Sequence, residues 1–253
     1  MGLLSLDALF PLDAPIAFAL IAASFLTSAI TATLGIGGGL LLLVLMGLVM
    51  PVATLIPVHG AVQLGSNAGR AWRQRHSIAW PIAWPFAVGA LVGAAIGAPI
   101  VTELPDAPFR IGLGVFVLLV TWRTIPALAA PGRASIAAGG AATTVLSMFF
   151  GATGPLVIGM LGQMIPERLA LVSTTAVAMS AQHGLKIMAF GVLGFPFGEW
   201  LPFLLAMVVV GYGGTVTGLE VLKRIPERRF RGLLRVVLTL LALNLVARGL
   251  LAL

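Results

Sequence analysis

The chain of 253 residues is 59% hydrophobic and 9% charged. Soluble domains contain about 25% charged residues, so this chain has too few to cover a globule, which excludes a soluble enzyme or nucleic-acid-binding domain. Because a membrane-spanning helix needs about 20 apolar residues, the length allows roughly ten such segments with short loops. The apolar runs are continuous rather than alternating, which favours helices over a barrel. We therefore expect a single all-α polytopic membrane domain over 1–253.

The net charge and the lack of cysteine restrict the kinds of binding and catalytic site that the chain can form. The net charge of +7 comes from 15 basic and 8 acidic residues. In a membrane protein, basic residues are best interpreted as topology determinants in cytoplasmic loops rather than as contacts to nucleic acid. The chain has no cysteine, which excludes disulfides, thiolate metal sites and cysteine nucleophiles. We expect no cofactor and no bound metal.

Ten apolar segments can be delimited, five in each half of the chain. They cover about 14–34, 37–50, 52–71, 79–101 and 109–127, then 134–151, 155–165, 167–189, 199–221 and 231–252. The second segment of each half is too short to span a membrane comfortably. Each of these short segments follows a glycine-rich break, at 35–39 and 151–155. The sequence predicts about eight full spans and two short broken helices.

The two halves of the chain share features in the same order. Pro, Phe and Arg of the motif at 104–110 recur in register at 225–231. Single positions also align: Gly93 with Gly214, Gly97 with Gly218, and Gly69 with Gly184. Convergent low complexity is the alternative, but matching charged and proline positions favour duplication, with repeats at 14–127 and 134–252.

The distribution of charge indicates the topology. Basic residues cluster in 70–76, 123–133 and 223–231, which we expect in the cytoplasm, whereas the loops at 103–110 and around 199 carry acidic residues. Five segments per half satisfy every loop and place both termini outside the cytoplasm. With an odd number of segments in each half, the second half enters the membrane in the opposite orientation to the first. The sequence therefore predicts an inverted-topology repeat. If each short segment only dips into the membrane, eight full spans remain.

The glycine breaks are the first candidate binding site. Free N–H groups at the start of a short helix bind anions, assisted by the helix dipole. Gly37, Gly38 and Gly39 would let a ligand approach the backbone closely, and Gly154 before Pro155 would do the same. The alternative is that these glycines only allow helices to cross tightly. We interpret Gly89, Gly93 and Gly97 in this second way, because they repeat every four residues.

The third segment of each half carries a polar stripe. His59, Gln63, Asn67 and Arg70 are spaced by four, four and three residues, so they share one helical face. In the second half Thr175, Gln182 and Lys186 share a face, with His183 adjacent. Two such stripes, each ending in a cation, predict a central anion pathway.

Each side chain in these stripes has a predicted role. Arg70 and Lys186 would supply charge, and Gln63, Asn67, Thr175 and Gln182 would donate hydrogen bonds. His59 and His183 would couple proton movement, because imidazole titrates near neutral pH. The alternatives are that the cations extend to the membrane interface and that the other side chains only join helices by hydrogen bonds.

The sequence does not indicate catalysis. An intramembrane enzyme needs a nucleophile beside a base, or paired carboxylates. Ser66 lies seven residues from His59, two helical turns away, which is too far for direct proton transfer. We therefore expect that the protein is not an enzyme.

Several motifs in order resemble the sulfite exporter TauE/SafE family. They are Gly-Ile-Gly-Gly-Gly-Leu at 35–40, an Arg-rich turn leading to Ile-Ala-Trp at 78–80, the glycine motif at 93–98 and a weaker glycine motif at 151–155. The resemblance covers about 15–248. It implies a polytopic carrier of the bacterial inner membrane that moves small sulfur-containing anions, such as sulfite or organosulfonates, outward. It carries over Gly35, Gly37, Gly38 and Gly39 as the family's motif. One departure is that the first proline after this motif is Pro51, whereas family members often have one sooner.

Together these features predict a secondary transporter that exports small sulfur oxyanions. Its expected partners are the anion and membrane lipid, with no nucleic acid, and a homo-oligomer stays open. A lipid-linked phosphate translocase and an anion channel are the alternative functions. The first would need a lateral opening to lipid, and the second a continuous polar pore.

Overall fold

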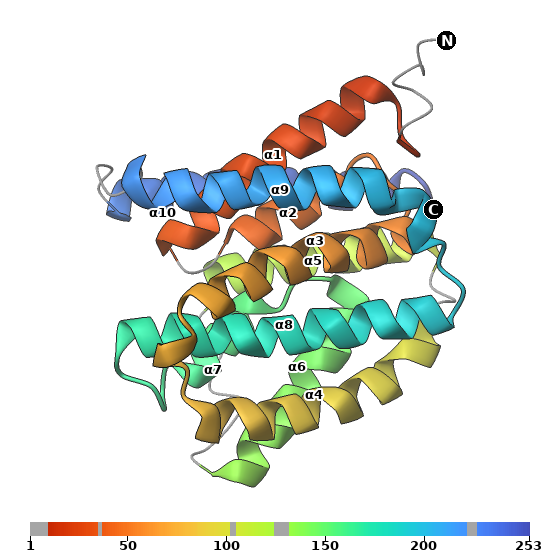
Figure 1. Cartoon of the computed structure of the whole chain (residues 1–253). Helices are drawn as coiled ribbons and strands as arrows, with labels where there is room; N and C mark the ends of the chain where they lie inside the picture. Colours follow the sequence, from red (N-terminus) through yellow and green to blue (C-terminus); the bar gives the residue numbers. More distant parts are fainter. Residues whose placement is uncertain (1–9, 35–36, 102–104, 124–131, 222–226) are drawn as a thin grey trace, which may run out of the picture.

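A computed structural model describes residues 10–34, 37–101, 105–123, 132–221 and 227–253. These residues form ten α-helices and a short 3-10 turn at Arg75–Ser77 (Figure 1). The helices are α1 (Ala14–Leu34), α2 (Gly38–Gly47), α3 (Val52–Arg73), α4 (Trp80–Val101), α5 (Asp106–Trp122), α6 (Arg133–Phe150), α7 (Gly154–Leu161), α8 (Arg168–Val192), α9 (Phe197–Val221) and α10 (Glu227–Leu250). The all-helical fold is confirmed, and most bounds lie within a few residues of the predicted segments.

The start of α5 differs from its predicted segment, as do the start of α10 at Glu227 rather than near 231 and the end of α7 at Leu161 rather than near 165. Helix α5 begins at Asp106 rather than near 109, because Pro105 is extended and Asp106 favours the positive start of a helix. The Asp106 carboxylate also accepts a hydrogen bond from the backbone N–H of Val52 at 3.1 Å. This bond joins the start of α5 to the start of α3. The predicted continuation to 127 falls outside the described residues.

Within the described ranges, four helices are long and apolar enough to cross a membrane. The apolar stretches are Ala14–Thr33 in α1, Trp80–Ile100 in α4, Phe197–Thr217 in α9 and Gly232–Leu250 in α10. Helices α3 and α8 are just as long but carry buried polar side chains, and α2 is apolar but short. Length and composition therefore support a membrane protein whose most polar helices lie inside the bundle.

Helices from the two halves pack against each other in pairs. Helix α3 lies against α8 in the centre, α1 against α9 and α4 against α6 on either side, and α5 against α10 (Figure 1). A Cβ added at Gly89 would lie 1.8 Å from the Ala137 carbonyl oxygen, and one at Gly214 would lie 2.0 Å from that of Phe25. Backbones touch at these crossings, so the close-packing interpretation of the α4 glycines is confirmed. The surroundings of Gly218 lie outside the described residues.

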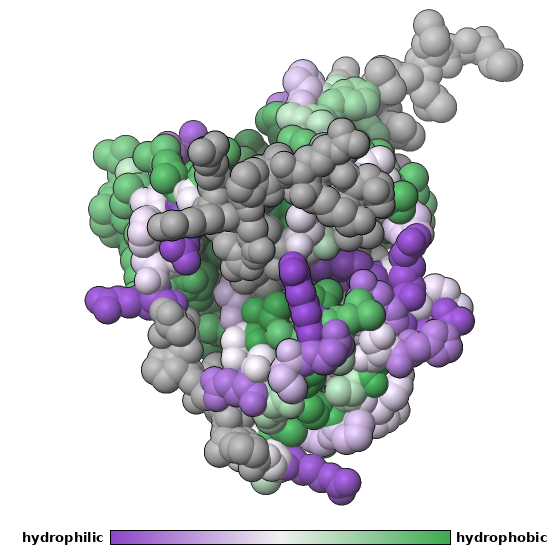
Figure 2. Space-filling model, turned by 90° about the vertical axis from the view of Figure 1, so that its left-hand side faces the viewer, coloured by the Kyte–Doolittle hydropathy of each residue, from purple (hydrophilic) through white to green (hydrophobic). Residues whose placement is uncertain are grey.

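One end of the bundle is rich in hydrophilic side chains. The end of α3 and the starts of α4, α6 and α8 lie together, and hydrophilic side chains gather on this end (Figures 1 and 2). It carries Arg73, Arg133 and Arg168 at helix ends. The start of α1 and the C-terminus lie at the opposite end (Figure 1). We refer to the first as the basic end.

The short helix α2 is held at its C-terminal side by two arginines. Arg110 donates hydrogen bonds to the carbonyl oxygens of Gly47 and Met50, and Arg248 donates to that of Leu48 at 3.0 Å. Cations stabilise the negative end of a helix and satisfy its last carbonyl groups. These contacts fix α2 so that its start lies in the interior of the bundle, beside the polar face of α3.

Candidate functional site

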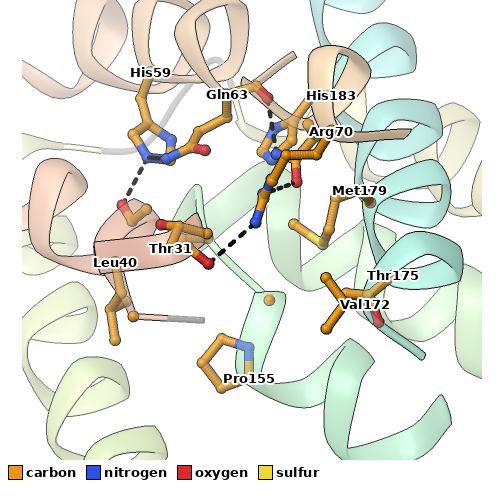
Figure 3. Close-up of a pocket in the computed structure, with 16 residues that line it drawn as sticks. Thr31, Leu40, His59, Gln63, Arg70, Pro155, Val172, Thr175, Met179 and His183 are labelled. Atoms are coloured by element: carbon orange, nitrogen blue, oxygen red, sulfur yellow. Dashed lines mark hydrogen bonds between the residues drawn. The ribbon is translucent and has the colours of Figure 1, made fainter. Parts of the chain in front are cut away.

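A small cavity lies where α2 and α7 begin, between the polar faces of α3 and α8 (Figure 3). Its volume is about 40 Å³. One water molecule needs about 10–15 Å³ of such space, so the cavity holds a few waters or one small ion. Nine of the residues predicted for the site line it: Gly37, Gly39, His59, Gln63, Asn67, Arg70, Gly154, Thr175 and His183.

Each short helix starts at the cavity after a glycine with an unusual backbone. Gly37 has φ +100 and Gly151 has φ +75, a region that only glycine enters without strain. Neither α2 nor α7 has a side chain that caps its start. The first N–H groups of a helix have no partner within the helix. Two helix starts therefore direct their positive dipole ends at one small space, and α2 adds unpaired N–H donors, whereas in α7 Pro155 has no N–H and Leu156 donates to the Thr153 carbonyl oxygen.

The face of α3 forms a hydrogen-bonded row along the cavity. The Nε2 of His59 donates to the carbonyl oxygen of Gly39 at 2.9 Å, because a carbonyl can only accept. Asn67 donates from its amide nitrogen to the Gln63 carbonyl oxygen at 2.8 Å. The Asn67 amide oxygen in turn accepts from the Arg70 guanidinium at 2.6 Å. These bonds orient the row and leave Arg70 at its end.

Arg70 is buried, and it has no charged partner among the residues that the structure describes. Its side chain is 8% exposed and donates to two neutral groups, Asn67 and the Thr31 carbonyl oxygen at 3.4 Å. Its Nε has no hydrogen-bond partner. Figure 3 shows the guanidinium reaching from α3 into the space above Pro155. A buried cation of this kind is costly unless an anion completes its shell.

Side chains of α8, together with His59 of α3, form a wall of the cavity that is partly polar and partly apolar. The Thr175 hydroxyl and the Nδ1 atoms of His59 and His183 are buried and have no partner. The two imidazole rings lie edge to face, with centroids 6.1 Å apart. Val172 and Met179 add apolar surface to the same wall. The Thr175 hydroxyl can donate a hydrogen bond to an anion, whereas the Nδ1 of neutral His59, whose Nε2 carries the proton, can only accept one.

Three predicted site residues lie outside the cavity lining. A Cβ at Gly38 would lie 1.8 Å from the Thr27 carbonyl oxygen, so Gly38 is packed against α1. Gln182 donates to the hydroxyls of Thr143 and Thr144, each at 2.9 Å, and accepts from Thr153 at 3.0 Å. Lys186 is fully buried, and its Nζ donates to the Gly151 carbonyl oxygen at 2.9 Å.

The structure adds lining residues that the sequence analysis did not select, chiefly Thr31, Leu40, Val172 and Met179. Thr31 belongs to a buried polar face of α1 together with Ser24, Thr27 and Ser28. Its spacing of three and four residues is the same signal that identified the α3 stripe, so Thr31 could have been found. Val172 and Met179 are apolar and gave no such signal.

Metal ligation has no geometric support in the residues that the structure describes. No three His, Cys, Asp or Glu side chains come together there in positions that could hold an ion. The polar atoms around the cavity are donors and imidazoles rather than carboxylates. This set suits an anion better than a cation.

The apolar helices and the interior polar cavity are those of a membrane protein with a polar site inside the bundle. Comparison with protein families agrees, because the model of the sulfite exporter TauE/SafE family matches residues 20–245. The chain belongs to this family, and the resemblance drawn from the glycine motifs is confirmed. Comparisons with curated proteins and with solved structures found no match.

Proposed function

We propose that the protein is a secondary transporter that exports small sulfur oxyanions, sulfite or an organosulfonate, across a bacterial inner membrane. The anion would bind in the central cavity, between the starts of α2 and α7 and the row on α3. The observation that carries this proposal is Arg70, a buried guanidinium with only neutral partners that points to the place where two uncapped helix starts converge.

The donor set fits an oxyanion. A guanidinium and backbone N–H groups form strong charge-assisted hydrogen bonds with anionic oxygens. Thr175 and the amide of Asn67 stand beside them as further hydrogen-bonding groups. The volume of about 40 Å³ favours a compact anion such as sulfite over a large headgroup. This size argues against the lipid-linked phosphate alternative.

We also propose that the two halves, 14–127 and 134–252, are inverted repeats. Exchanging each helix for its counterpart, α1 for α6 and α4 for α9, converts the α1–α9 contact into the α6–α4 contact. The same exchange leaves the α3–α8 and α5–α10 pairs unchanged. Such pairing is what a two-fold relation between repeats produces, with about eight spans and two short helices.

In this proposal the basic end faces the cytoplasm and both termini lie on the other side. Arg70 lies one turn from the end of α3 at the basic end, so the cavity would load from the cytoplasm. Inverted repeats exchange roles when the transporter opens to the other face. Lys186 and Gln182 on α8 would then contact the anion in that second state.

A flux measurement tests the proposed function. Purified protein in proteoliposomes is expected to move radiolabelled sulfite with saturation, and a pH gradient is expected to change the rate. The substitution His183→Gln should reduce the effect of the gradient, because it removes an imidazole that can accept and release a proton when the cavity opens to water. Saturable flux that does not respond to the gradient in the unsubstituted protein would contradict proton coupling. Absence of sulfite flux from folded protein would contradict sulfite as the substrate.

A further inference from the structure

We propose that the transporter is an obligatory anion exchanger, in which export of one anion requires import of another. The central cavity would have to hold an anion whenever the protein changes the face to which it opens. This inference rests on the proposed transport function and adds the mode of transport. It follows from the charge of the cavity rather than from its shape.

The charge that must be balanced belongs to Arg70. A guanidinium cannot lose its proton under conditions in which a protein stays folded, so this charge is permanent. The side chain is 8% exposed, and its hydrogen-bond partners are the Thr31 carbonyl and the Asn67 amide oxygen. Its Nε has no partner. A site built this way is complete only when an anion is present.

Two carboxylates in the described part of the chain, those of Glu167 and Asp106, form hydrogen bonds away from the cavity. Glu167 accepts hydrogen bonds from the backbone N–H groups of Leu169 and Ala170 at the start of α8. The Asp106 carboxylate accepts a hydrogen bond from the backbone N–H of Val52 at the start of α3, which is the end away from Arg70. No acidic side chain among the described residues forms an ion pair with Arg70. The side chains that the structure describes therefore offer no counter-charge that could follow the guanidinium through the conformational change.

The other basic groups near the cavity can add positive charge but cannot balance that of Arg70. Lys186 on α8 is a second basic side chain, and its Nζ donates to the neutral Gly151 carbonyl oxygen. A proton bound by His59 or His183 would add positive charge rather than remove it. A dianion that enters with such a proton has the same net charge as a monovalent anion. Proton coupling and exchange are therefore compatible.

Whether the cavity holds an anion or is empty then determines how fast the protein changes the face to which it opens. In the open state, water solvates the guanidinium, and a bound monovalent anion neutralises its charge. Closing an empty cavity expels this water and leaves an unpaired charge in a low-dielectric interior, which is strongly unfavourable. Closing a loaded cavity has no such penalty. The loaded transporter should switch quickly and the empty one slowly, which is the definition of exchange.

The experiment compares two external solutions with the same proteoliposomes. Vesicles that hold radiolabelled sulfite are diluted into medium with unlabelled sulfite or with gluconate, which is too large for the cavity. Potassium and valinomycin clamp the membrane potential at zero, so that a voltage cannot limit net efflux. We expect efflux into sulfite to exceed efflux into gluconate by about a hundredfold or more.

A charge-removing variant and a matched control accompany this comparison. Arg70→Gln removes the permanent charge, so the ratio of the two rates should fall toward one. Arg73→Gln alters an exposed cation on the same helix, three residues away, and should preserve the ratio. If Arg70→Gln does not fold, the two-solution comparison with the unsubstituted protein decides alone.

The outcomes separate the exchange proposal from the proposed substrate. Equal efflux into both solutions would overturn exchange and leave sulfite transport in place. No efflux into either solution would contradict sulfite as the substrate, and the same two solutions with methanesulfonate in place of sulfite would then decide exchange. If neither anion moves, both proposals are wrong.

Discussion

Replacing Arg70 with glutamine is expected to reduce sulfite transport by about a hundredfold or more while the protein remains folded. The substitution removes the permanent charge at the cavity and its charge-assisted bonds to the anion, and losing a buried charge-assisted contact costs about 3 kcal/mol, or roughly a hundredfold in binding. Lysine at this position should retain part of the activity, because it keeps the charge but not the fork of donors. Initial rates of radiolabelled sulfite uptake measure the effect.

Arg73→Gln is the matched control for this experiment. Arg73 lies on the same helix, is exposed, and makes only a long contact of 3.5 Å with the Tyr212 hydroxyl. Its removal changes the net charge equally but leaves the cavity intact. Equal losses in both variants would show that the overall charge, and not the buried guanidinium, supports transport.

Replacing Gly38 with alanine is expected to destabilise the protein by about 3 kcal/mol or more, because overpacking at a rigid contact is costly. The added Cβ would lie 1.8 Å from the Thr27 carbonyl oxygen, and a backbone group of α1 cannot move aside. We expect less folded protein in detergent and a lower melting temperature, measured by size-exclusion profile and thermal unfolding.

Two neighbouring glycines distinguish packing from ligand binding. A Cβ at Gly39 would meet the amide nitrogen of Gln63 at 2.5 Å, which is the far end of a flexible side chain. Gly39→Ala should therefore fold but transport poorly, since Gln63 must shift in the cavity. Gly159→Ala is the control, because nothing lies within 4 Å of its Cβ. A Gly38→Ala variant as stable as Gly159→Ala would contradict the close contact with α1.

The helices could be predicted from the sequence because residues with a direct effect on helix formation mark where they begin and end. Continuous apolar runs, two glycine breaks and Pro residues before helices locate nearly every element. The α3 row could also be predicted, because polar side chains inside an apolar bundle are costly and therefore mark an interior face with a function. That face carries His59, Gln63, Asn67 and Arg70. Packing glycines were predicted from their spacing of four residues and confirmed by their contacts.

The α8 side could not be resolved in the same way. Helical periodicity indicates which face a residue occupies, but not which turn of that face reaches a cavity. Thr175 and Lys186 share a face, yet Lys186 lies three turns further along α8 and contacts Gly151 instead of the cavity. Gln182 bonds to threonines of α6, and no local pattern marks those threonines as its partners. These differences depend on how two distant helices are placed.

The most direct test of the central claim is an experimental structure with a bound heavy-atom analogue of sulfite. Crystals or particles prepared with selenite allow the anion to be located by the anomalous signal or by density for selenium. The account predicts one anion within about 3 Å of the Arg70 guanidinium and of backbone N–H groups at the start of α2 or α7. Selenite bound elsewhere, with the cavity beside Arg70 holding only water, would contradict it.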